Sequence, residues 1–538
     1  MKNRPYPLYT LGTKYTIKQI AEDMAAENPG HIFFQFRKGG SVAQKTAAEF
    51  LDEINAAGTW LYHNGIKNSH VAIVANNSYA WVVLYFAIIS SGNVVVPIDK
   101  DLLKADCEAL LEHSETRFVF TDKSHIKRFT EPESENRLGL SFFDIANLDD
   151  IVSEGKAYLA AGEDEFINYK PDTSALASIV YTSGTTGTPK GVMLSQDNML
   201  FDINPGCRNF TPGASLLSTL PFHHMFGLVV SLLMPLNWKC TVFINSGVKY
   251  LAPDFKLASP KSTMLVPLHI QSLHKIIMQK AKNEGKYEKL RRGMKLSLAL
   301  YNHGIDVRRR LMKDVRAAFG SNLDFILVGG AALDPYYERE FRAFGIDIIT
   351  AYGATECSPG IAVNRNYYYR EGSCGLAVED SEIRIAGDGE VMIRGGHVMS
   401  GYYHNEEETK KCLKDGWYMS GDLGYLDDDG FLFLTGRRKN LIILSDGNNV
   451  SPEVLESKIQ LIPGVAEVLV YEENAEITAE IYPEPESGLE LSYFEKEIEK
   501  MNESIPIAQR VTRVKTRDTE FIKNTSKKII RTQIKKES

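Results

Sequence analysis

The stretch between Tyr181 and Gly191 carries the residue types that phosphate binding needs. Its glycines let the backbone turn several N–H groups toward one point, and its Ser and Thr hydroxyls add neutral donors. Such a concavity suits phosphate oxygens, and a lysine at its end supplies a cation. We therefore predict a phosphate-binding loop formed by Thr182, Ser183, Gly184, Thr185, Thr186 and Gly187, with Lys190 as its cation.

This loop differs from a Walker A loop, which has the pattern G-x-x-x-x-G-K-[ST] and opens a helix. Here Lys190 follows Pro189 and precedes Gly191, and no helix is expected behind it. The alternative is a hairpin turn rich in small residues. A hairpin turn takes about two to five residues. Because this stretch is much longer, we favour the phosphate loop.

Apolar strands are expected on both sides of the loop, at 176–180 and 192–194. The first third of the chain has a similar pattern, with apolar runs at 71–75 and 94–96 separated by a helical segment at 81–90. Continuous apolar runs joined by a helix are typical of parallel strands buried on both faces. The pattern predicts a large α/β domain with layered sheets and helices.

A second strand–helix–strand unit is better delimited. The pattern predicts a strand at 323–328, a helix with Asp334 as N-cap and Pro335 at its first position, and a strand at 346–351. Gly345 is suited to end the helix. Both strands of such a unit point the same way, so both glycine-containing ends lie at one edge of the sheet. Open α/β sheets bind ligands at that edge.

The last hundred residues have a different character. After a strand at 431–434 comes the basic stretch 436–440. Two further strands at 465–471 and 476–482 are expected to form an antiparallel hairpin. Helical segments are expected near 452–461 and 489–503. The sequence predicts a large domain over residues 1–436 and a small α+β domain over residues 437–538.

Composition excludes several classes of protein. The chain has 538 residues and a formal net charge of −8. A general nucleic-acid binder would need a basic excess to displace counterions from phosphates, so no nucleic-acid partner is expected. The apolar stretch 82–98 is interrupted by polar residues and is interpreted as helix, turn and strand rather than a membrane span. The pattern does not indicate an oligomeric state.

The spacing of the cysteines and the first residues of the sequence indicate the cellular compartment of the protein. The six cysteines lie far apart without a C-x-x-C pair, which is typical of reduced thiols rather than a disulfide framework or a zinc site. The beginning of the sequence has no apolar region of the kind found in a secretory signal. We therefore expect a cytoplasmic protein.

Several segments, in order along the chain, resemble the motifs of the adenylate-forming superfamily, which includes acyl- and aryl-CoA ligases, peptide-synthetase adenylation domains and firefly-type luciferases. Two positions depart from the motifs, since Ser420 stands for Thr and Lys527 for Gly. The matching segments are the phosphate loop, Pro221–Gly227, Gly329–Ala331, Tyr352–Glu356, Trp417–Asp422, Gly436–Ile442 and Ser526–Arg531.

The resemblance implies an ATP-dependent ligase for a small-molecule carboxylic acid. The carboxylate attacks the α-phosphate of ATP, giving acyl-AMP and pyrophosphate, and the acyl group then passes to coenzyme A. Lys190 and the phosphate loop hold the phosphates together with Mg²⁺, for which Glu356 is the expected protein ligand. Thr355 is assigned to catalysis with its neighbour Glu356.

The resemblance also assigns contacts with the nucleotide. Asp422 accepts hydrogen bonds from the ribose hydroxyls, and Arg437 approaches the same ribose. The adenine site consists of Gly330, Ala331, Tyr352, Gly353, Ala354 and Thr355.

The resemblance implies separate roles for two lysines of the small domain. Lys528 neutralises the repulsion between carboxylate and α-phosphate, and Lys439 is the hinge about which the mobile small domain turns after adenylation. The adjacent Lys527 leaves the register open by one residue. We choose Lys528 because Ile529 and Arg531 then align with the motif.

The identity of the acid and of the acceptor stays open. The paired-histidine motif assigns His224 and Phe226 to the acyl pocket, and the segments around 327–335 and 447–453 most resemble the long- and medium-chain fatty acyl-CoA ligase branch. An aryl or short acid, and a carrier-protein acceptor, are alternatives. A nucleotide-binding relative without turnover is the alternative from another class. An acyl hydrolase is disfavoured because no G-x-S-x-G motif occurs.

Overall fold

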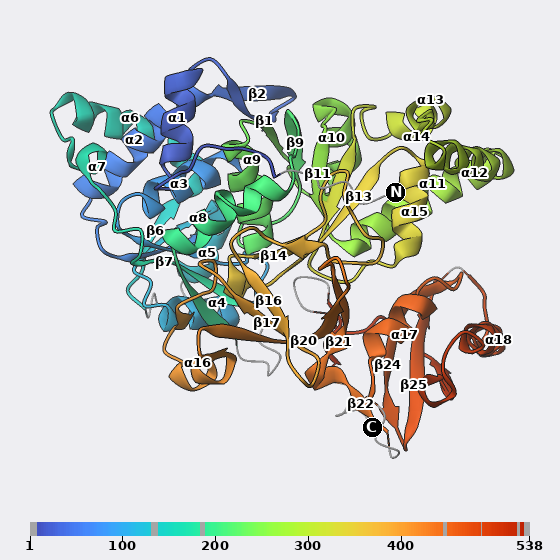
Figure 1. The fold of residues 1–538 in the computed structure, drawn as a ribbon. Helices are drawn as coiled ribbons and strands as arrows, with labels where there is room; N and C mark the ends of the chain where they lie inside the picture. Colours follow the sequence, from blue (N-terminus) through green and yellow to red (C-terminus); the bar gives the residue numbers. More distant parts are fainter. Residues whose placement is uncertain are drawn as a thin grey trace. The chain divides into compact units, whose positions relative to one another are not determined.

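A computed structural model describes residues 8–130, 138–182, 189–444, 449–485, 487–523 and 528–531 (Figure 1). The chain divides into two compact units. The large unit comprises residues 1–331, 335–382 and 394–418, and the small unit comprises residues 332–334, 383–393 and 419–538. In the described ranges, no helix is long and apolar enough to cross a bilayer.

One sheet of the large unit has seven strands in the order β18-β8-β7-β4-β3-β5-β6. Strands β3 and β4 are parallel, as the apolar runs predict, and β5 joins β3 in parallel as well. Strand β8 pairs antiparallel with both β7 and β18. The strands are β3 (His70–Val74), β4 (Val94–Pro97), β5 (Phe118–Thr121), β6 (Ser141–Asp144), β7 (Leu176–Thr182), β8 (Lys190–Ser195) and β18 (Gly401–Tyr402).

The helix between β3 and β4 is itself buried. Helix α3 (Tyr79–Ile89) has ten buried residues, which is the expected result for a helix that is apolar on every side. Ser78 begins the helix, because its side chain accepts a hydrogen bond from the Trp81 N–H. The predicted strand–helix–strand unit is therefore present, with its helix in the core.

The second large sheet has nine strands in the order β15-β14-β13-β12-β11-β9-β10-β1-β2. Strands β12 and β13 are parallel and flank α15, so the second predicted strand–helix–strand unit is also present. The strands are β1 (Ile32–Lys38), β2 (Ser41–Thr46), β9 (Ser215–Ser218), β10 (Thr241–Ile244), β11 (Ser262–Leu265), β12 (Phe325–Val328), β13 (Asp347–Gly353), β14 (Gly360–Val363) and β15 (Leu376–Ala377).

Helices surround these sheets in Figure 1. Helix α2 begins with a complete capping box, in which Thr46 and Glu49 satisfy each other's backbone N–H groups. A π-helix covers Phe226–Leu233. The α-helices are α1 (Gln19–Glu27), α2 (Ala47–His63), α4 (Lys104–His113), α5 (Lys123–Thr130), α6 (Leu148–Ala160), α7 (Glu165–Asn168), α8 (Gln196–Ile203), α9 (Met234–Asn237), α10 (Leu251–Ala258), α11 (Pro267–Asn283), α12 (Tyr287–Asn302), α13 (Arg308–Leu311), α14 (Lys313–Ala317), α15 (Pro335–Ala343) and α16 (Glu406–Cys412).

Strand β20 (Trp417–Leu426) begins in the large unit, where it pairs with β19 (Leu413–Lys414). It continues into the small unit, where it pairs antiparallel with β21 (Leu432–Arg437). Strands β16 (Glu382–Ile385) and β17 (Glu390–Arg394) lie around the same boundary of the chain.

The rest of the small unit follows the sequence prediction closely. Strands β24 (Val465–Glu473) and β25 (Glu476–Pro483) form the expected antiparallel hairpin. The expected helices are α17 (Pro452–Ile459) and α18 (Leu491–Asn502). A third strand, β26 (Arg513–Thr516), joins β25 in parallel and was not foreseen. The short strands β22 (Ile442–Ile443) and β23 (Asn449–Val450) pair with each other.

Candidate functional site

The phosphate loop connects two paired strands. Thr182, the last residue of β7, lies opposite Lys190, the first residue of β8. The connection therefore joins two antiparallel strands and no helix opens behind Lys190, which agrees with the exclusion of a Walker A loop. The predicted loop residues Ser183, Gly184, Thr185, Thr186 and Gly187 lie outside the described residues.

Lys190 has an internal partner. Its ammonium forms an ion pair with Glu408 of α16 and lies 5.0 Å from the centre of the Tyr402 ring. Hydrogen bonds from Lys190 and Lys411 lower the pKa of Glu408 to about 2. Glu408 therefore carries a full negative charge at neutral pH, and a phosphate that approaches Lys190 must compete with it.

Glu356 lies in a short 3₁₀ turn, Thr355–Cys357, directly after β13. Its side chain is half-buried, and its Oε1 accepts a hydrogen bond of 2.8 Å from the Tyr402 hydroxyl. Burial, with Glu356 as a further cause, raises the pKa of Tyr402 well above its usual value. The phenol is therefore protonated at neutral pH and acts as a donor to the carboxylate.

Tyr402 thus connects the two charged residues that the sequence assigned to phosphate and metal. Its hydroxyl contacts Glu356, and its ring lies against Lys190. Neither Tyr402 nor Glu408 is among the functional residues that the sequence predicts. No spacing rule would have found them, because the contacts span 46 residues from Glu356 to Tyr402 and 218 residues from Lys190 to Glu408.

Backbone hydrogen bonds hold Tyr402 in this place. The segment 396–403, here called the brace, runs between β8 and the Glu356 turn. On one side, the N–H of Tyr403 donates to the Gly191 carbonyl at 2.7 Å. On the other, the N–H of Met399 donates to the Glu356 carbonyl at 2.9 Å. The brace therefore fixes the spacing between Lys190 and Glu356 through the main chain as well as through a side chain.

The predicted adenine residues lie at the carboxyl ends of two neighbouring parallel strands. Gly330 and Ala331 follow β12, while Tyr352 and Gly353 end β13. The backbone φ of Gly330 is +83°, a region in which other residues are strained. A Cβ on Gly353 would lie 2.2 Å from the Pro359 carbonyl oxygen, so this position also requires glycine.

The short link between those strand ends and Glu356 is also well defined. Ala354 lies between Gly353 and the Thr355 turn, and its N–H donates to the Pro359 carbonyl at 3.0 Å. Ala354, Thr355 and Glu356 are each half-buried. The geometry therefore places the whole predicted Tyr352–Glu356 motif at one edge of the nine-stranded sheet.

Of the two predicted acyl-pocket residues, Phe226 lies beside that same edge. The ring of Phe226 comes within 3.2 Å of where a Cβ on Gly329 would be, so the absence of a side chain allows this approach. The rings of His223 and His224 lie with their centres 4.3 Å apart. Burial, and then His224, lower the pKa of His223 to about 3 against the attraction of Asp99, so His223 is neutral at physiological pH.

In the small unit, four predicted residues form one electrostatic cluster. Asp422 is only 5% exposed and lies opposite Arg437 across β20 and β21, with Arg437 Nε 2.6 Å from Asp422 Oδ1. Burial and then Arg437 lower the pKa of Lys439 to about 8, against the attraction of Asp422 and Glu453.

Lys528 belongs to this cluster too. Its residue surface is exposed, yet neighbouring atoms partly desolvate the ammonium and lower its pKa, and Arg437 lowers it further. Asp422 opposes that shift. The alternative Lys527 lies outside the described residues. Asp422, Arg437, Lys439 and Lys528 therefore share one region of the small unit.

The residues present fit a magnesium–phosphate group better than a closed metal cage. In the described ranges, no group of three or more His, Cys, Asp or Glu side chains could hold a metal ion. Mg²⁺ typically takes one or two carboxylates and fills its other positions with phosphate oxygens and water. One carboxylate, Glu356, beside the strand ends is compatible with that mode of binding.

Comparisons with known proteins agree with these observations. Residues 21–403 match the AMP-binding enzyme family. A long-chain-fatty-acid–CoA ligase (FadD15) from Mycobacterium bovis is 31% identical over 487 residues, which cover 86% of this chain and 81% of the relative. A 2-succinylbenzoate–CoA ligase from Listeria innocua is 26% identical over 432 residues, which cover 79% of this chain and 80% of the relative.

A solved structure shows that the fold is shared. The o-succinylbenzoate CoA synthetase of Bacillus subtilis, in complex with ATP and magnesium ion, superposes with a TM-score of 0.73 at 22% identity. The match covers 96% of this chain and 99% of the other. The predicted fold class, a large α/β domain with a small α+β domain, is confirmed.

Proposed function

Because the chain belongs to the AMP-binding enzyme family and is an AMP-forming acid–CoA ligase, we propose that its acid is a fatty acid and that ATP and Mg²⁺ bind at the Glu356 edge. The similarity to a long-chain-fatty-acid–CoA ligase over most of both chains supports this choice of acid. The segments around 327–335 and 447–453, which most resemble the long- and medium-chain fatty acyl-CoA ligase branch, agree with this choice.

The reaction has two steps. In the first, a carboxylate oxygen attacks the α-phosphorus of ATP, the bond to the bridging oxygen of the β-phosphate breaks, and pyrophosphate leaves. In the second, the thiolate of coenzyme A attacks the acyl carbonyl and AMP leaves, so the thiol proton is lost to solvent. Both reactants of the first step are anions. The site must therefore gather positive charge and dipoles where negative charge develops.

In the large unit, Lys190 and Glu356 are the groups that meet the polyphosphate. Mg²⁺ bound through Glu356 would supply charge neutralisation at the phosphates. Tyr402 orients the Glu356 carboxylate through its hydroxyl and lies against the Lys190 ammonium. We assign Tyr402 as a positioning residue, since it would act through the two charged groups that it contacts.

Glu408 acts as an internal counterion for Lys190. The β- and γ-phosphates exchange places with it when ATP binds. The pair is partly exposed, with 18% of the Lys190 and 29% of the Glu408 side chain accessible. Such an ion pair stabilises the protein by about 1 kcal/mol or less, so breaking it when ATP binds requires little free energy.

In the small unit, Asp422 and Arg437 bind the ribose, and Lys528 neutralises the carboxylate and the α-phosphate during attack. Residues 437–538 form a lid with Lys439 as its hinge. The observation that supports this set of roles is the clustering of Asp422, Arg437 and Lys528, which the sequence separates by up to about a hundred residues.

The observation that carries the proposed nucleotide site as a whole is the connection of Lys190 and Glu356 through Tyr402. These two residues come from motifs on different sheets, and the brace keeps them together. A phosphate-binding cation beside a single carboxylate matches what a magnesium polyphosphate requires.

Carboxylate-dependent exchange between ATP and labelled pyrophosphate tests the first step. Acids of increasing chain length are assayed, with an aryl acid and acetate for comparison. Each methylene that enters an apolar tunnel contributes about 0.8 kcal/mol, or roughly a fourfold gain in kcat/KM. We expect this gain to continue along a fatty chain. A maximum at acetate or at the aryl acid would contradict the fatty-acid assignment.

Addition of the acceptor tests the second step. Coenzyme A and a phosphopantetheinylated carrier protein are compared for release of AMP and formation of the thioester. We expect coenzyme A to accept the acyl group. Transfer to the carrier protein alone would contradict coenzyme A as acceptor, and absence of exchange with every acid would indicate a nucleotide-binding relative without turnover.

A further inference from the structure

One segment of the large unit has a charge opposite to that of the rest of the chain. Residues 261–316 contain fourteen Lys and Arg but only four Asp and Glu, a net charge of +10. The whole chain carries −8, so the remainder carries −18. The segment covers helices α11 to α14, which Figure 1 shows beside α15.

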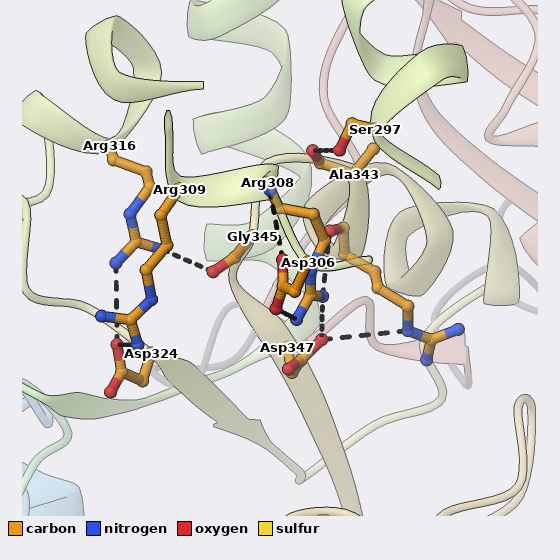
Figure 2. A network of polar contacts seen from close by, with 10 residues as sticks. Ser297, Asp306, Arg308, Arg309, Arg316, Asp324, Ala343, Gly345 and Asp347 are labelled. Carbon is orange, nitrogen blue, oxygen red and sulfur yellow. Dashed lines mark hydrogen bonds and ion pairs between the residues drawn. The ribbon is translucent and has the colours of Figure 1, made fainter. Parts of the chain in front are cut away.

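The buried arginines of this segment are used inside the protein, as Figure 2 shows. Arg308 donates to Asp347 at 2.8 Å and pairs with Asp306. Arg316 donates to the Gly345 carbonyl. Arg316 also pairs with Asp324 at 3.6 Å, directly before β12. These contacts stabilise the amino ends of β12 and β13, at the edge opposite to the Glu356 turn. Their charge is therefore compensated within the fold.

The lysines, in contrast, point outward. Helices α11 and α12 both pack against α15, and their opposite faces are exposed. The only acidic residues between positions 267 and 302 are Glu284 and Glu288. Glu284 pairs with Lys286 at 2.8 Å and with Lys280 at 3.9 Å. The exposed basic residues are Lys275, Lys280, Lys282, Lys286, Lys289, Arg292 and Lys295.

Apolar side chains are exposed on the same helices. Among the described residues, eighteen large apolar side chains are exposed, and six of them lie between positions 257 and 311, three of these on α11 and α12. Ile276 on α11 is 63% exposed and lines a shallow surface groove with Lys275 and Lys280. Leu268 on α11 and Leu296 on α12 are also exposed. Concentrated exposed apolar side chains mark a surface that another molecule covers.

We propose that the outer face of α11 and α12, here called the basic face, docks on an anionic lipid surface. Lysines on an exposed helix are attracted to anionic headgroups, and neighbouring aliphatic side chains enter the headgroup region. The face offers both kinds of side chain. This docking does not depend on the proposed acid or on turnover.

The chemistry of the face favours lipid over nucleic acid. Proteins that bind single-stranded nucleic acid stack bases on aromatic side chains. The exposed large apolar side chains of α11 and α12, which are Leu268, Ile276 and Leu296, are all Leu or Ile. The ring of Tyr287 on α12 is half-buried and lies 5.4 Å from the Lys282 ammonium. Aliphatic side chains give no stacking surface but partition readily into the outer part of a bilayer.

Sedimentation of the full-length protein with vesicles tests the proposal. Vesicles of phosphatidylcholine alone are compared with vesicles containing about one-third phosphatidylglycerol. We expect binding to the anionic vesicles only, and a decrease at high salt because salt screens the attraction. Equal binding to both kinds of vesicle, or to neither, would overturn the proposal.

A charge-reversal variant tests the residues. Lys282→Glu, Lys289→Glu and Lys295→Glu together should lower binding to anionic vesicles by about tenfold or more. The matched control reverses three exposed lysines elsewhere in the large unit, Lys123, Lys127 and Lys170, and should retain binding. Equal loss in both variants would show that net charge, and not this face, is responsible.

Two further measurements test the insertion of aliphatic side chains and the choice of lipid as partner. The pair Ile276→Ser and Leu296→Ser keeps every charge and should weaken binding severalfold, whereas unchanged binding would contradict insertion of these side chains. If an acidic protein or duplex DNA binds the basic face while anionic vesicles do not, the lipid assignment is wrong. Pyrophosphate exchange in solution should be unchanged in all these variants, so a failure of the proposed function is detected separately.

Discussion

The large and small units arrange their charged site residues in different ways. In the large unit, each charge has an internal partner: Lys190 pairs with Glu408, and Glu356 accepts from Tyr402. In the small unit, cations predominate around Asp422, and the pKa values of Lys439 and Lys528 are lowered.

This difference indicates two ways of preparing a site for an anion. Under the proposed function, an incoming phosphate would replace the carboxylate that neutralises Lys190 in the large unit. In the small unit, an incoming anion would relieve repulsion among cations that the fold itself brings together. Displacing Glu408 from Lys190 should cost little free energy and adjust the affinity for ATP. Relieving the repulsion among the cations of the small unit should have a larger effect on the reaction rate. Substitutions in the two units can test this contrast.

The largest effect is expected at Lys528. The Lys528→Ala variant should lower carboxylate-dependent pyrophosphate exchange by roughly a hundredfold to a thousandfold, since one stabilising contact to the developing charge is lost. ATP binding, measured by calorimetry, should remain. The control Lys496→Ala removes an exposed lysine on α18 and should have no effect. Near-normal exchange by the Lys528 variant would contradict its role.

A substitution at the proposed hinge should impair the second half-reaction and leave the first intact. In Lys439→Pro, pyrophosphate exchange should persist while thioester formation falls by about a hundredfold, because proline fixes φ and restricts the residue before it. The two steps are measured separately in the same preparation. Lys439→Ala keeps the backbone free and should support both steps. Equal loss of both steps in the proline variant would argue against a hinge.

Tyr402 gives a smaller, more specific effect. Tyr402→Phe removes the hydrogen bond to the Glu356 carboxylate, which is worth about 1.5–3 kcal/mol, so exchange should fall by roughly tenfold or more. The Mg²⁺ concentration for half-maximal activity should rise, which a purely structural role would not cause. Tyr403→Phe loses only a hydrogen bond to the exposed Glu115 and serves as the control. An unchanged Mg²⁺ requirement would show that Tyr402 does not position Glu356.

Substitution of Glu408 should have the smallest effect on the reaction. Unlike the other substitutions, it should strengthen ATP binding rather than impair activity. Glu408→Gln removes the competitor for Lys190, so the KM for ATP should decrease by about fivefold or less, the range for a partly exposed ion pair. Glu407→Gln breaks only a pair with Lys411 and is the control. A rise in KM would contradict the idea that ATP phosphates replace Glu408.

The smallest expected effect is on stability in alkaline solution. The pKa of Lys439 is about 8 in the folded protein, against the ordinary lysine value of 10.5. Between these values the unfolded chain binds more protons, so stability should rise as pH increases from about 8 to 10.5. The residue is exposed, which keeps the rise small. Thermal unfolding of Lys439→Gln over this range should lack that rise, and an identical profile would refute the shift.

Much of the fold could be predicted from local patterns. The strand–helix–strand unit at β12, α15 and β13 and the hairpin of β24 and β25 were expected from periodicity and turn residues, and both are present. The parallel strand β26 was not predicted, because its partner β25 lies about thirty residues earlier in the chain and no tight turn connects the two strands. The site roles assigned to residues such as Lys528 stay predictions.

What the sequence determined by itself is the set of local requirements: a glycine at 345 to end a helix, a strand where apolar residues run continuously, and motif residues at strand ends. Tertiary structure alone decided that Tyr402 meets Glu356, that Glu408 meets Lys190, and that α12 turns its lysines outward. The physical reason is that secondary structure follows from interactions within a few residues. Contacts across many tens of residues depend instead on which elements pack together, and no local pattern encodes them.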